Sequence, residues 1–174
     1  MRLKSATLCC RYAKNDFLCR FFLSMSYTNL LLHVIIRTKY SRDAFPNEHA
    51  EKLYRYIWGF VRGKKCILHR INGIPNHLHL LVDLHPSIAV SDFVKELKTS
   101  THAWLKKQHT IFPDFIAWGS QYAALAVSEA DKERVVAYIA RQREHHKVVN
   151  FENEYRKILQ ENGINPDEQY WLKD

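Results

Sequence analysis

The sequence predicts an α+β fold in which a ferredoxin-like β-α-β-β-α-β antiparallel sheet carries helices on one face. Three observations lead to this class. Apolar runs typical of strands alternate with stretches of helical apolar spacing in the order strand, helix, strand, strand, helix, strand. Further helical segments follow at the C-terminal end. The length of 174 residues suits one domain with a core better than two.

The first strand and the first helix have clear signatures. Residues 30–38 (LLLHVIIRT) are rich in β-branched and large apolar residues, which predicts a strand. A helix is expected from a cap at Asn47 to about Arg62, because apolar residues recur there at helical spacing. Gly63 is expected to end this helix.

The middle of the chain predicts a strand pair. Residues 66–71 and 77–84 are short apolar runs of strand length. Asn72 and Gly73 favour tight turns, so we expect them to join the two strands.

The remaining elements follow from the same patterns. Ser91 is expected to cap a second helix that runs to about Gln108. Residues 122–127 predict a short fourth strand. Two more helices are expected, one from about Asp131 and one over residues 151–162, and the first of these carries Tyr138.

Charge and cysteine content separate the first 24 residues from the rest. The chain carries a net charge of +8, which favours a polyanionic partner, and half of this excess lies in residues 1–24. The same segment contains three of the four cysteines and leaves Cys66 alone in the remainder, which fits a reducing cytoplasm. No stretch approaches the roughly 20 apolar residues of a membrane span. We therefore expect residues 1–24 to be a non-native or disordered N-terminal extension and residues 25–174 to form the domain.

Two histidines mark a candidate metal site. His77 and His79 lie two residues apart in a predicted strand, and alternation places both imidazoles on one face. Two imidazoles so arranged can share a metal ion. The alternative is a pair of histidines on a solvent-facing strand, and apolar residues on both sides of the pair favour a central strand instead.

Tyr138 is a candidate nucleophile. Successive helical residues are rotated by about 100°, which places Val135 and Ile139 on an apolar arc and Tyr138 at its polar edge, beside Gln142. A core tyrosine would be expected among the valines. The alternative is an ordinary surface tyrosine on a solvated helix.

These residues resemble the motifs of the IS200/IS605-like tyrosine transposases. The sequence His77-Leu78-His79 is similar to their histidine–hydrophobic–histidine (HUH) motif. Residues 138–142 (YIARQ) resemble their catalytic tyrosine with a metal-binding glutamine four positions later. The likeness extends in order over residues 25–174. It departs from the family pattern at Arg141, where asparagine is expected, and at residues 123–126.

The resemblance implies a site and a chemistry. Tyr138 would be the catalytic nucleophile, and His77, His79 and Gln142 would bind a divalent metal ion, Mg²⁺ or Mn²⁺. The activity would be metal-dependent cleavage and rejoining of single-stranded DNA with hairpin ends through a 5′-phosphotyrosine intermediate. DNA contacts are expected from five polar side chains: His33, Arg37, Lys39, Arg141 and His145. The expected assembly is a homodimer with active sites shared between subunits.

Other readings of the same residues remain open. The main alternative is a non-catalytic, domesticated protein of the same fold that binds hairpin DNA without cutting it. A replication initiator or relaxase of the wider HUH group would carry a larger chain and a differently placed tyrosine. A metal hydrolase would need several carboxylate ligands, and the sequence shows none clustered near His77 and His79.

Overall fold

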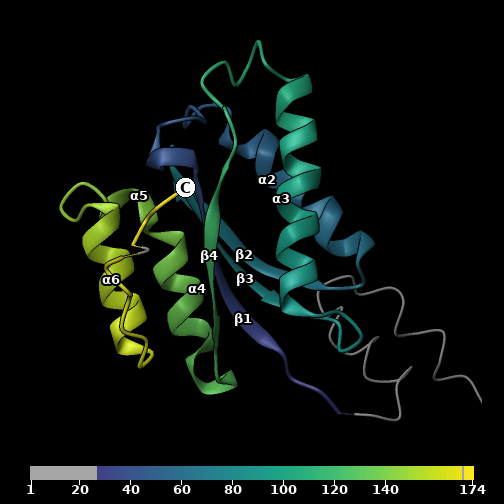
Figure 1. Ribbon diagram of the computed structural model, residues 1–174. Coiled ribbons are helices and arrows are strands. Elements are labelled where there is room, and N and C mark those ends of the chain that lie inside the picture. Colours follow the sequence, from purple (N-terminus) through teal and green to yellow (C-terminus); the bar gives the residue numbers. More distant parts are fainter. Residues whose placement is uncertain (1–26, 170) are drawn as a thin grey trace, which may run out of the picture.

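Four antiparallel strands form one sheet in the computed structural model, which describes residues 27–169 and 171–174. The spatial order is β2-β3-β1-β4 (Figure 1). This order and the sequence of elements along the chain confirm the predicted ferredoxin-like fold. The predicted extension, residues 1–24, lies outside the described residues. The strands are β1 (Leu31–Thr38), β2 (Ile67–Ile74), β3 (His77–Asp83) and β4 (Trp118–Ala126).

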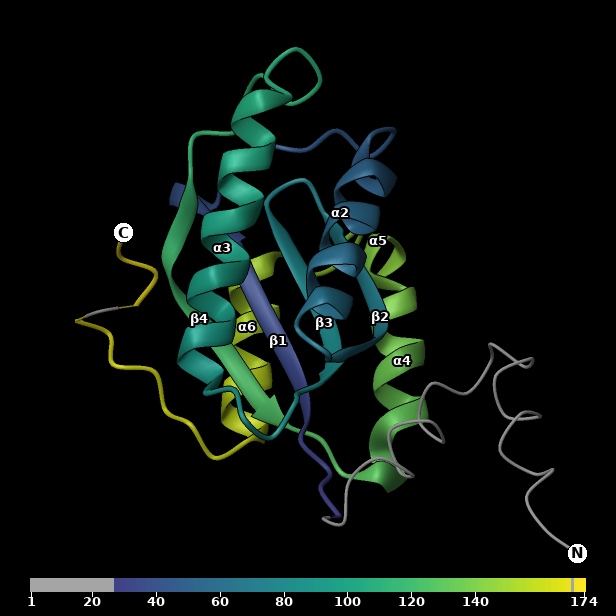
Figure 2. The same cartoon turned by 90° about the vertical axis from the view of Figure 1, so that its right-hand side faces the viewer.

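Two helices cover one face of the sheet, as predicted. They are α2 (Ala50–Gly63) and α3 (Val90–Lys107), which lie side by side over the strands (Figure 2). Alternate residues of β1 and β3, such as Val34 and Leu80, point toward them and are fully buried in the main core.

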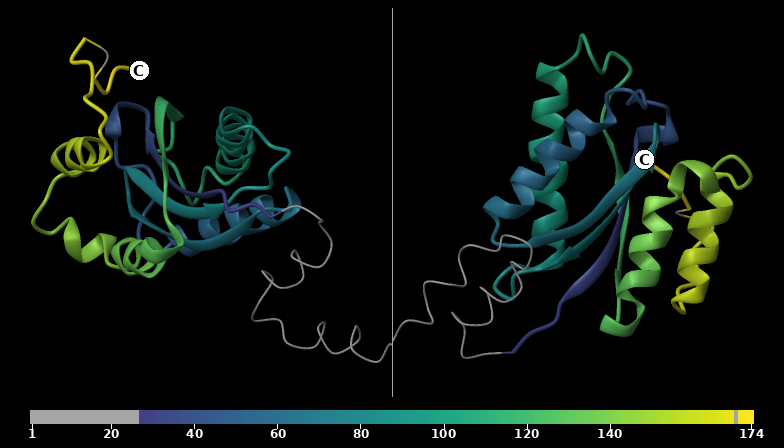
Figure 3. Two further views of the ribbon diagram at one scale, coloured as in Figure 1. Left: turned by 90° about the horizontal axis from the view of Figure 1, so that it is seen from below. Right: turned by 180° about the vertical axis from the view of Figure 1, so that it is seen from behind.

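The C-terminal helices cover the opposite face (Figure 3). They are α4 (Lys132–Ala140), the four-residue α5 (Gln142–His145) and α6 (Phe151–Glu161). Val135 and Ile139 of α4 pack against Leu31 and Leu81, and α6 packs against β1 and β4 through a second apolar cluster. The sheet therefore lies between two helical layers. Among the described residues, no helix has the length and apolarity needed to cross a membrane.

The turn between β2 and β3 lies further along the chain than predicted. Asn72 and Gly73 belong to β2, and the turn is formed by Pro75 and Asn76. A Cβ atom on Gly73 would lie 2.1 Å from the carbonyl oxygen of His77, so this position accepts only glycine without a shift of backbone. Gly73 therefore allows β2 and β3 to approach each other closely, and it does not form the turn between them.

Both predicted helix caps were also misplaced. The residue before α2 is His49 rather than Asn47, and the residue before α3 is Ala89 rather than Ser91. Neither of these residues caps its helix with a side-chain hydrogen bond. Serine and asparagine near a helix start favour capping only where the local backbone places them at the boundary.

Strand β4 is longer than predicted and contains a bulge. Between the pairs Ile36–Tyr122 and Thr38–Trp118, β4 has two more residues than β1. The ammonium group of Lys98 in α3 donates hydrogen bonds to the carbonyl oxygens of residues 119, 120 and 121 at 2.9, 3.1 and 2.8 Å. Lys98 therefore supplies a donor to three backbone acceptors within the bulged stretch of β4. Burial, and secondarily nearby Arg37, lowers the pKa of Lys98 to about 8.

Candidate active site

The histidine pair lies at the centre of the sheet. His77 and His79 pair with Arg37 and Ile35 of β1 and with Ile74 and Asn72 of β2, and both imidazoles are 0 % exposed. They share the face that α4, α5 and α6 cover. The predicted alternation is confirmed, and the alternative of a solvent-facing pair is wrong.

Neighbouring groups fix the orientation of both rings. Nδ1 of His77 lies 2.7 Å from Oδ1 of Asn76, and since an amide oxygen only accepts, this nitrogen carries the proton. Nε2 of His77 is therefore left with a free lone pair. Nδ1 of His79 lies 2.9 Å from Nε2 of His33. Burial, and then the neighbouring His79, lowers the pKa of His77 well below its usual value, so the ring is neutral.

Tyr138 and Gln142 approach the histidines from the helical layer. They lie on consecutive helices rather than on one, because α4 ends at Ala140 and α5 begins at Gln142. The side chain of Asn72 donates a 2.9 Å hydrogen bond to the carbonyl oxygen of Ala140 and so ties this break to β2. The ring centroid of Tyr138 lies 6.0 Å from that of His79, and Gln142 is fully buried.

A carboxylate that the sequence analysis did not single out lies at the centre of the cluster. Glu154 of α6 is 3 % exposed. Its Oε1 accepts hydrogen bonds from the hydroxyl of Tyr138 and from Nε2 of Gln142, the latter at 2.8 Å. Its Oε2 lies 3.5 Å from Nε2 of His77 and 3.5 Å from Nε2 of His79. This geometry corrects the statement that no carboxylate clusters with the histidines.

His146 completes the group. Its Nε2 lies 3.0 Å from Oε2 of Glu154 and 3.1 Å from Nε2 of His77. The sequence held a signal for Glu154, because it occupies the apolar stripe of α6 between Phe151 and Tyr155. A charged residue on a buried stripe needs partners, and the histidines supply them. His146 adjoins His145 in the sequence and lies just beyond α5, a position that favours a structural or DNA-contact role over metal ligation from the sequence alone.

The electrostatics of the site follow from its burial. Burial, and then the negative charge of Glu154, raises the pKa of Tyr138 above its usual value. Burial by itself would raise the pKa of Glu154, but the close imidazoles of His146 and His79 outweigh this and lower it. The tyrosine is therefore a protonated hydroxyl beside an ionised carboxylate.

The residues present fit a divalent metal ion. Within the described part of the chain, His79 Nε2, Gln142 Oε1 and Glu154 Oε2 are buried and have no hydrogen-bond partner. Buried polar atoms normally have hydrogen-bond partners, so several unpaired buried atoms around one point require an explanation. All three are atoms that ligate metals, and one carboxylate among neutral imidazoles suits a cation.

The structure divides the five expected DNA contacts into two groups. His33 and Arg37 are buried and have protein partners: His33 contacts His79, and Arg37 donates to the carboxylate of Asp174 at 2.7 Å. Burial, and then His79, lowers the pKa of His33 to about 3. These placements favour structural roles for both. Lys39 and Arg141 are half-buried or exposed and remain accessible, whereas Nε2 of the half-buried His145 is itself buried, 3.5 Å from Oε1 of Glu154.

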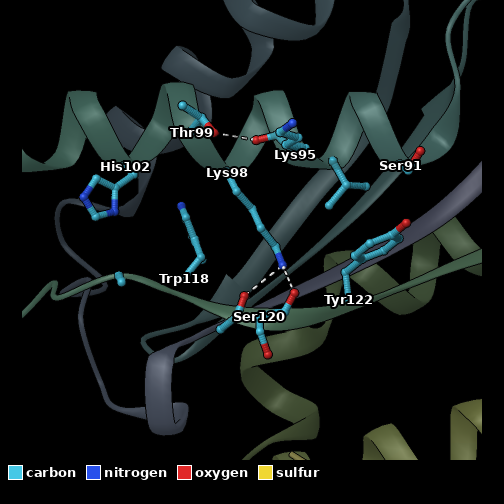
Figure 4. Close-up of a pocket in the computed structure, with 11 residues that line it drawn as sticks. Ser91, Lys95, Lys98, Thr99, His102, Trp118, Ser120 and Tyr122 are labelled. Atoms are coloured by element: carbon cyan, nitrogen blue, oxygen red, sulfur yellow. Dashed lines mark hydrogen bonds between the residues drawn. The ribbon is translucent and has the colours of Figure 1, made fainter. Parts of the chain in front are cut away.

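A groove of about 870 Å³ opens beside Tyr138 between α4 and α6. Its lining includes the basic side chains of Arg134, Arg141 and Lys157 and the acidic side chains of Asp131, Glu144, Glu154 and Glu161. A second hollow, of about 500 Å³, lies between α3 and β4 on the other side of the sheet (Figure 4). It is remote from Tyr138, and Lys98 projects across it. The groove beside Tyr138 is therefore the candidate path for a substrate.

Residues 26–142 match the sequence model of the family described as "Transposase IS200 like". This match includes His77, His79, Tyr138 and Gln142. The chain belongs to the IS200-like transposase family. Its role is accordingly that of a transposase, and the resemblance that the motifs indicated is confirmed.

Individual relatives agree with the family. The ISDra2 transposase TnpA of Deinococcus radiodurans is 26% identical over 117 residues, which cover 63% of this chain and 81% of the relative. A crystal structure of a D. radiodurans protein described as a transposase has a TM-score of 0.55 and 26% identity, covering 68% of this chain and 95% of the other. A second structure, described as a REP-associated tyrosine transposase bound to a REP hairpin, has a TM-score of 0.54 at 16% identity, covering 72% of this chain and 74% of the other. At 16% identity, the likeness to this last structure shows a shared fold alone.

Proposed function

We propose that this IS200-like transposase cuts and rejoins single-stranded DNA with hairpin ends through Tyr138, with a divalent metal ion bound by His77 and His79 and aided by Gln142. One observation carries the proposal. A tyrosine hydroxyl, a carboxamide and two neutral imidazoles from three elements converge in one buried cluster beside an open groove. The hairpin partner is suggested by the structural relative described with a REP hairpin.

The tyrosine would act as a nucleophile. Its oxygen would attack the phosphorus of the scissile phosphodiester, forming a bond to the 5′ phosphate as the bond to the 3′ oxygen breaks. The 3′ oxygen takes a proton from solvent and leaves as a hydroxyl, and the tyrosine gives its own proton to solvent. The phosphotyrosine keeps the energy of the broken bond, so attack by another 3′-hydroxyl can rejoin DNA without ATP.

The other residues position and neutralise charge. Glu154 holds the hydroxyl of Tyr138 by its hydrogen bond, and Asn76 and His33 hold the rings of His77 and His79. A divalent cation, Mg²⁺ or Mn²⁺, would supply positive charge to the scissile phosphate, which its own negative charge otherwise protects from attack. His77, His79 and Gln142 are neutral groups, so none of these three would reduce that positive charge.

The covalent intermediate provides the test of the proposed function. Single strands that contain the imperfect palindromes flanking the gene, labelled at either end, are incubated with protein and Mg²⁺ or Mn²⁺. We expect a denaturant-resistant adduct that carries the label on the 3′ side of the cut, and none with a chelator. Binding of the hairpin without any adduct would instead support the non-catalytic alternative.

We further propose a homodimer in which tyrosine helices can be exchanged. Helices α4–α6 add no strand to the sheet and are joined to β4 only through residues 127–131. Exchange between two copies would therefore break no strand pairing, and the apolar contacts of Val135 and Ile139 would be remade with the partner. The contacts within one chain identify the side chains that come together. In an exchanged dimer the same side chains would meet across the two subunits.

Subunit mixing tests the shared site. A His77→Ala, His79→Ala protein is mixed with a Tyr138→Phe protein under conditions that allow exchange. Shared sites are expected to restore about a quarter of the wild-type site number, because half of randomly formed dimers are mixed and each has one intact site. Light scattering provides the control for the dimer itself. A mixture that stays inactive although exchange is demonstrated would place each site within one chain.

A further inference from the structure

We infer that His146 and Glu154 complete the cation site with His77 and His79, so that it takes a first-row transition metal ion in preference to Mg²⁺. The inference rests on the proposed cation site of the histidine pair. It adds two ligands that lie beyond residues 26–142, the part of the chain that matches the family. The four side chains form a group whose ligand atoms all lie within 4.8 Å of one another.

The spacing of these atoms matches that of ligands around one ion. Ligands bound at about 2.0–2.2 Å in a tetrahedral site lie roughly 3.3–3.5 Å apart. Oε2 of Glu154 is 3.5, 3.5 and 3.0 Å from Nε2 of His77, His79 and His146. Nε2 of His77 is 3.1 Å from that of His146. These four of the six distances are close to those around one ion, and all six lie within 4.8 Å.

Each imidazole presents the correct nitrogen. The Nδ1 atoms of His77, His79 and His146 all have hydrogen-bond neighbours outside the cluster, respectively Asn76 Oδ1, His33 Nε2 and the carbonyl oxygen of Val149, the last at 2.8 Å. Metal-bound histidines typically engage their second nitrogen in this way, which fixes the ring and its tautomer. Three Nε2 atoms thus face one point.

The charges at this point call for a cation. The Oε2 atom of Glu154 and Nε2 of His79 are buried and lack a hydrogen-bond partner within the described residues. Nε2 of His77, whose proton is on Nδ1, faces Nε2 of His146 at 3.1 Å, a contact that two lone pairs would make unfavourable. The competing arrangement is a protonated His146 that forms an ion pair with Glu154 and needs no metal.

The donor set selects the class of ion. Mg²⁺ prefers oxygen ligands in an octahedral arrangement, whereas imidazole suits Zn²⁺, Co²⁺ and other transition metals. Three imidazoles and one carboxylate therefore favour ions such as Mn²⁺, Co²⁺ and Zn²⁺. Gln142, whose Nε2 already donates to Oε1 of Glu154, would support the carboxylate.

Metal titration of the full chain tests the inference without an activity assay. Binding of Co²⁺, Zn²⁺, Mn²⁺ and Mg²⁺ is measured by calorimetry, and the visible absorption of bound Co²⁺ reports the ligand set. We expect Glu154→Gln and His146→Asn each to weaken Co²⁺ and Zn²⁺ binding by at least about tenfold, since even loss of a supporting residue costs 10–100-fold. Both variants should also alter the Co²⁺ spectrum. Glu152→Gln is the matched control, because Glu152 is an exposed carboxylate of the same helix.

The outcomes separate this inference from the proposed function. Wild-type affinity and spectrum in both variants, with binding lost in His77→Ala, His79→Ala, would overturn the inference and leave the cation site of the histidine pair intact. Failure of the wild type to bind any of the four ions would overturn both. Circular dichroism of each variant shows whether it is folded, and His146→Asn carries the test alone if Glu154→Gln does not fold.

Discussion

Replacing Tyr138 with phenylalanine is expected to abolish the covalent protein–DNA adduct and to reduce strand cleavage by about a thousandfold or more. Loss of a nucleophile removes the covalent route altogether, and losses of this size or larger are measured for other nucleophilic enzymes. The ring remains in Tyr138→Phe, so the contacts with His33 and His79 are kept. Gel analysis of labelled single strands after denaturation measures both effects.

The control for this variant is Tyr122→Phe. Tyr122 is 37% exposed on β4, on the far side of the sheet from the Tyr138 groove, and lines the other hollow. Cleavage and adduct formation should be unchanged in it. An adduct of wild-type yield in Tyr138→Phe would show that another residue attacks the phosphate. Metal affinity should remain near the wild-type value in both variants, which separates chemistry from cation binding.

Substituting alanine for Gly73 is expected to destabilise the protein by about 3 kcal/mol or more. The new Cβ would lie 2.1 Å from the carbonyl oxygen of His77 and 3.0 Å from Cα of Leu78, and backbone atoms cannot rotate away as a side chain can. Strands β2 and β3 would have to separate locally. Because His77 is itself displaced, cation binding should weaken together with the melting temperature.

Gly59→Ala is the matched control, because it adds the same methyl group at a glycine that has free space around it. Gly59 lies inside α2, and a Cβ there would meet nothing within 4 Å. Alanine is favoured over glycine in a helix by roughly 0.5–1 kcal/mol, so this variant should be slightly more stable than the wild type. Denaturant unfolding of the two variants measures the contrast. Equal stability of Gly73→Ala and wild type would contradict the close approach of β2 and β3.

The sequence predicted the sheet and the histidine pair because both depend on local periodicity. The alternation of residues 77–84 fixes which side chains share a face, and apolar spacing places α2 and α3 within a few residues. Boundaries were less accurate, since Asn72 and Gly73 favour turns but serve inter-element contacts here. Asn72 holds the end of α4, and Gly73 allows the approach of His77.

Long-range packing explains what the sequence analysis missed. Glu154 reaches the histidines only because α6 packs against β1 and β4, and helical periodicity does not give the partner of a helix. The break at Arg141 was missed for the same reason, because the hydrogen bond from Asn72 crosses from another element. His146 lies after that break, so the direction of its side chain depends on where α4 ends. Tyr138 and Gln142 were found through the family resemblance rather than through their contacts.

The Lys98 cap on β4 has a consequence for how copies of this protein can meet. β4 is an edge strand, and exposed edge carbonyls can accept a strand from another molecule. The ammonium of Lys98 already occupies those of residues 119–121, and Figure 4 shows its hydrogen bonds to the first two of them. An incoming strand that paired with any of these carbonyl oxygens would have to displace a charged donor. The cap therefore discourages edge-to-edge pairing along this part of β4, and with it the growth of sheet aggregates.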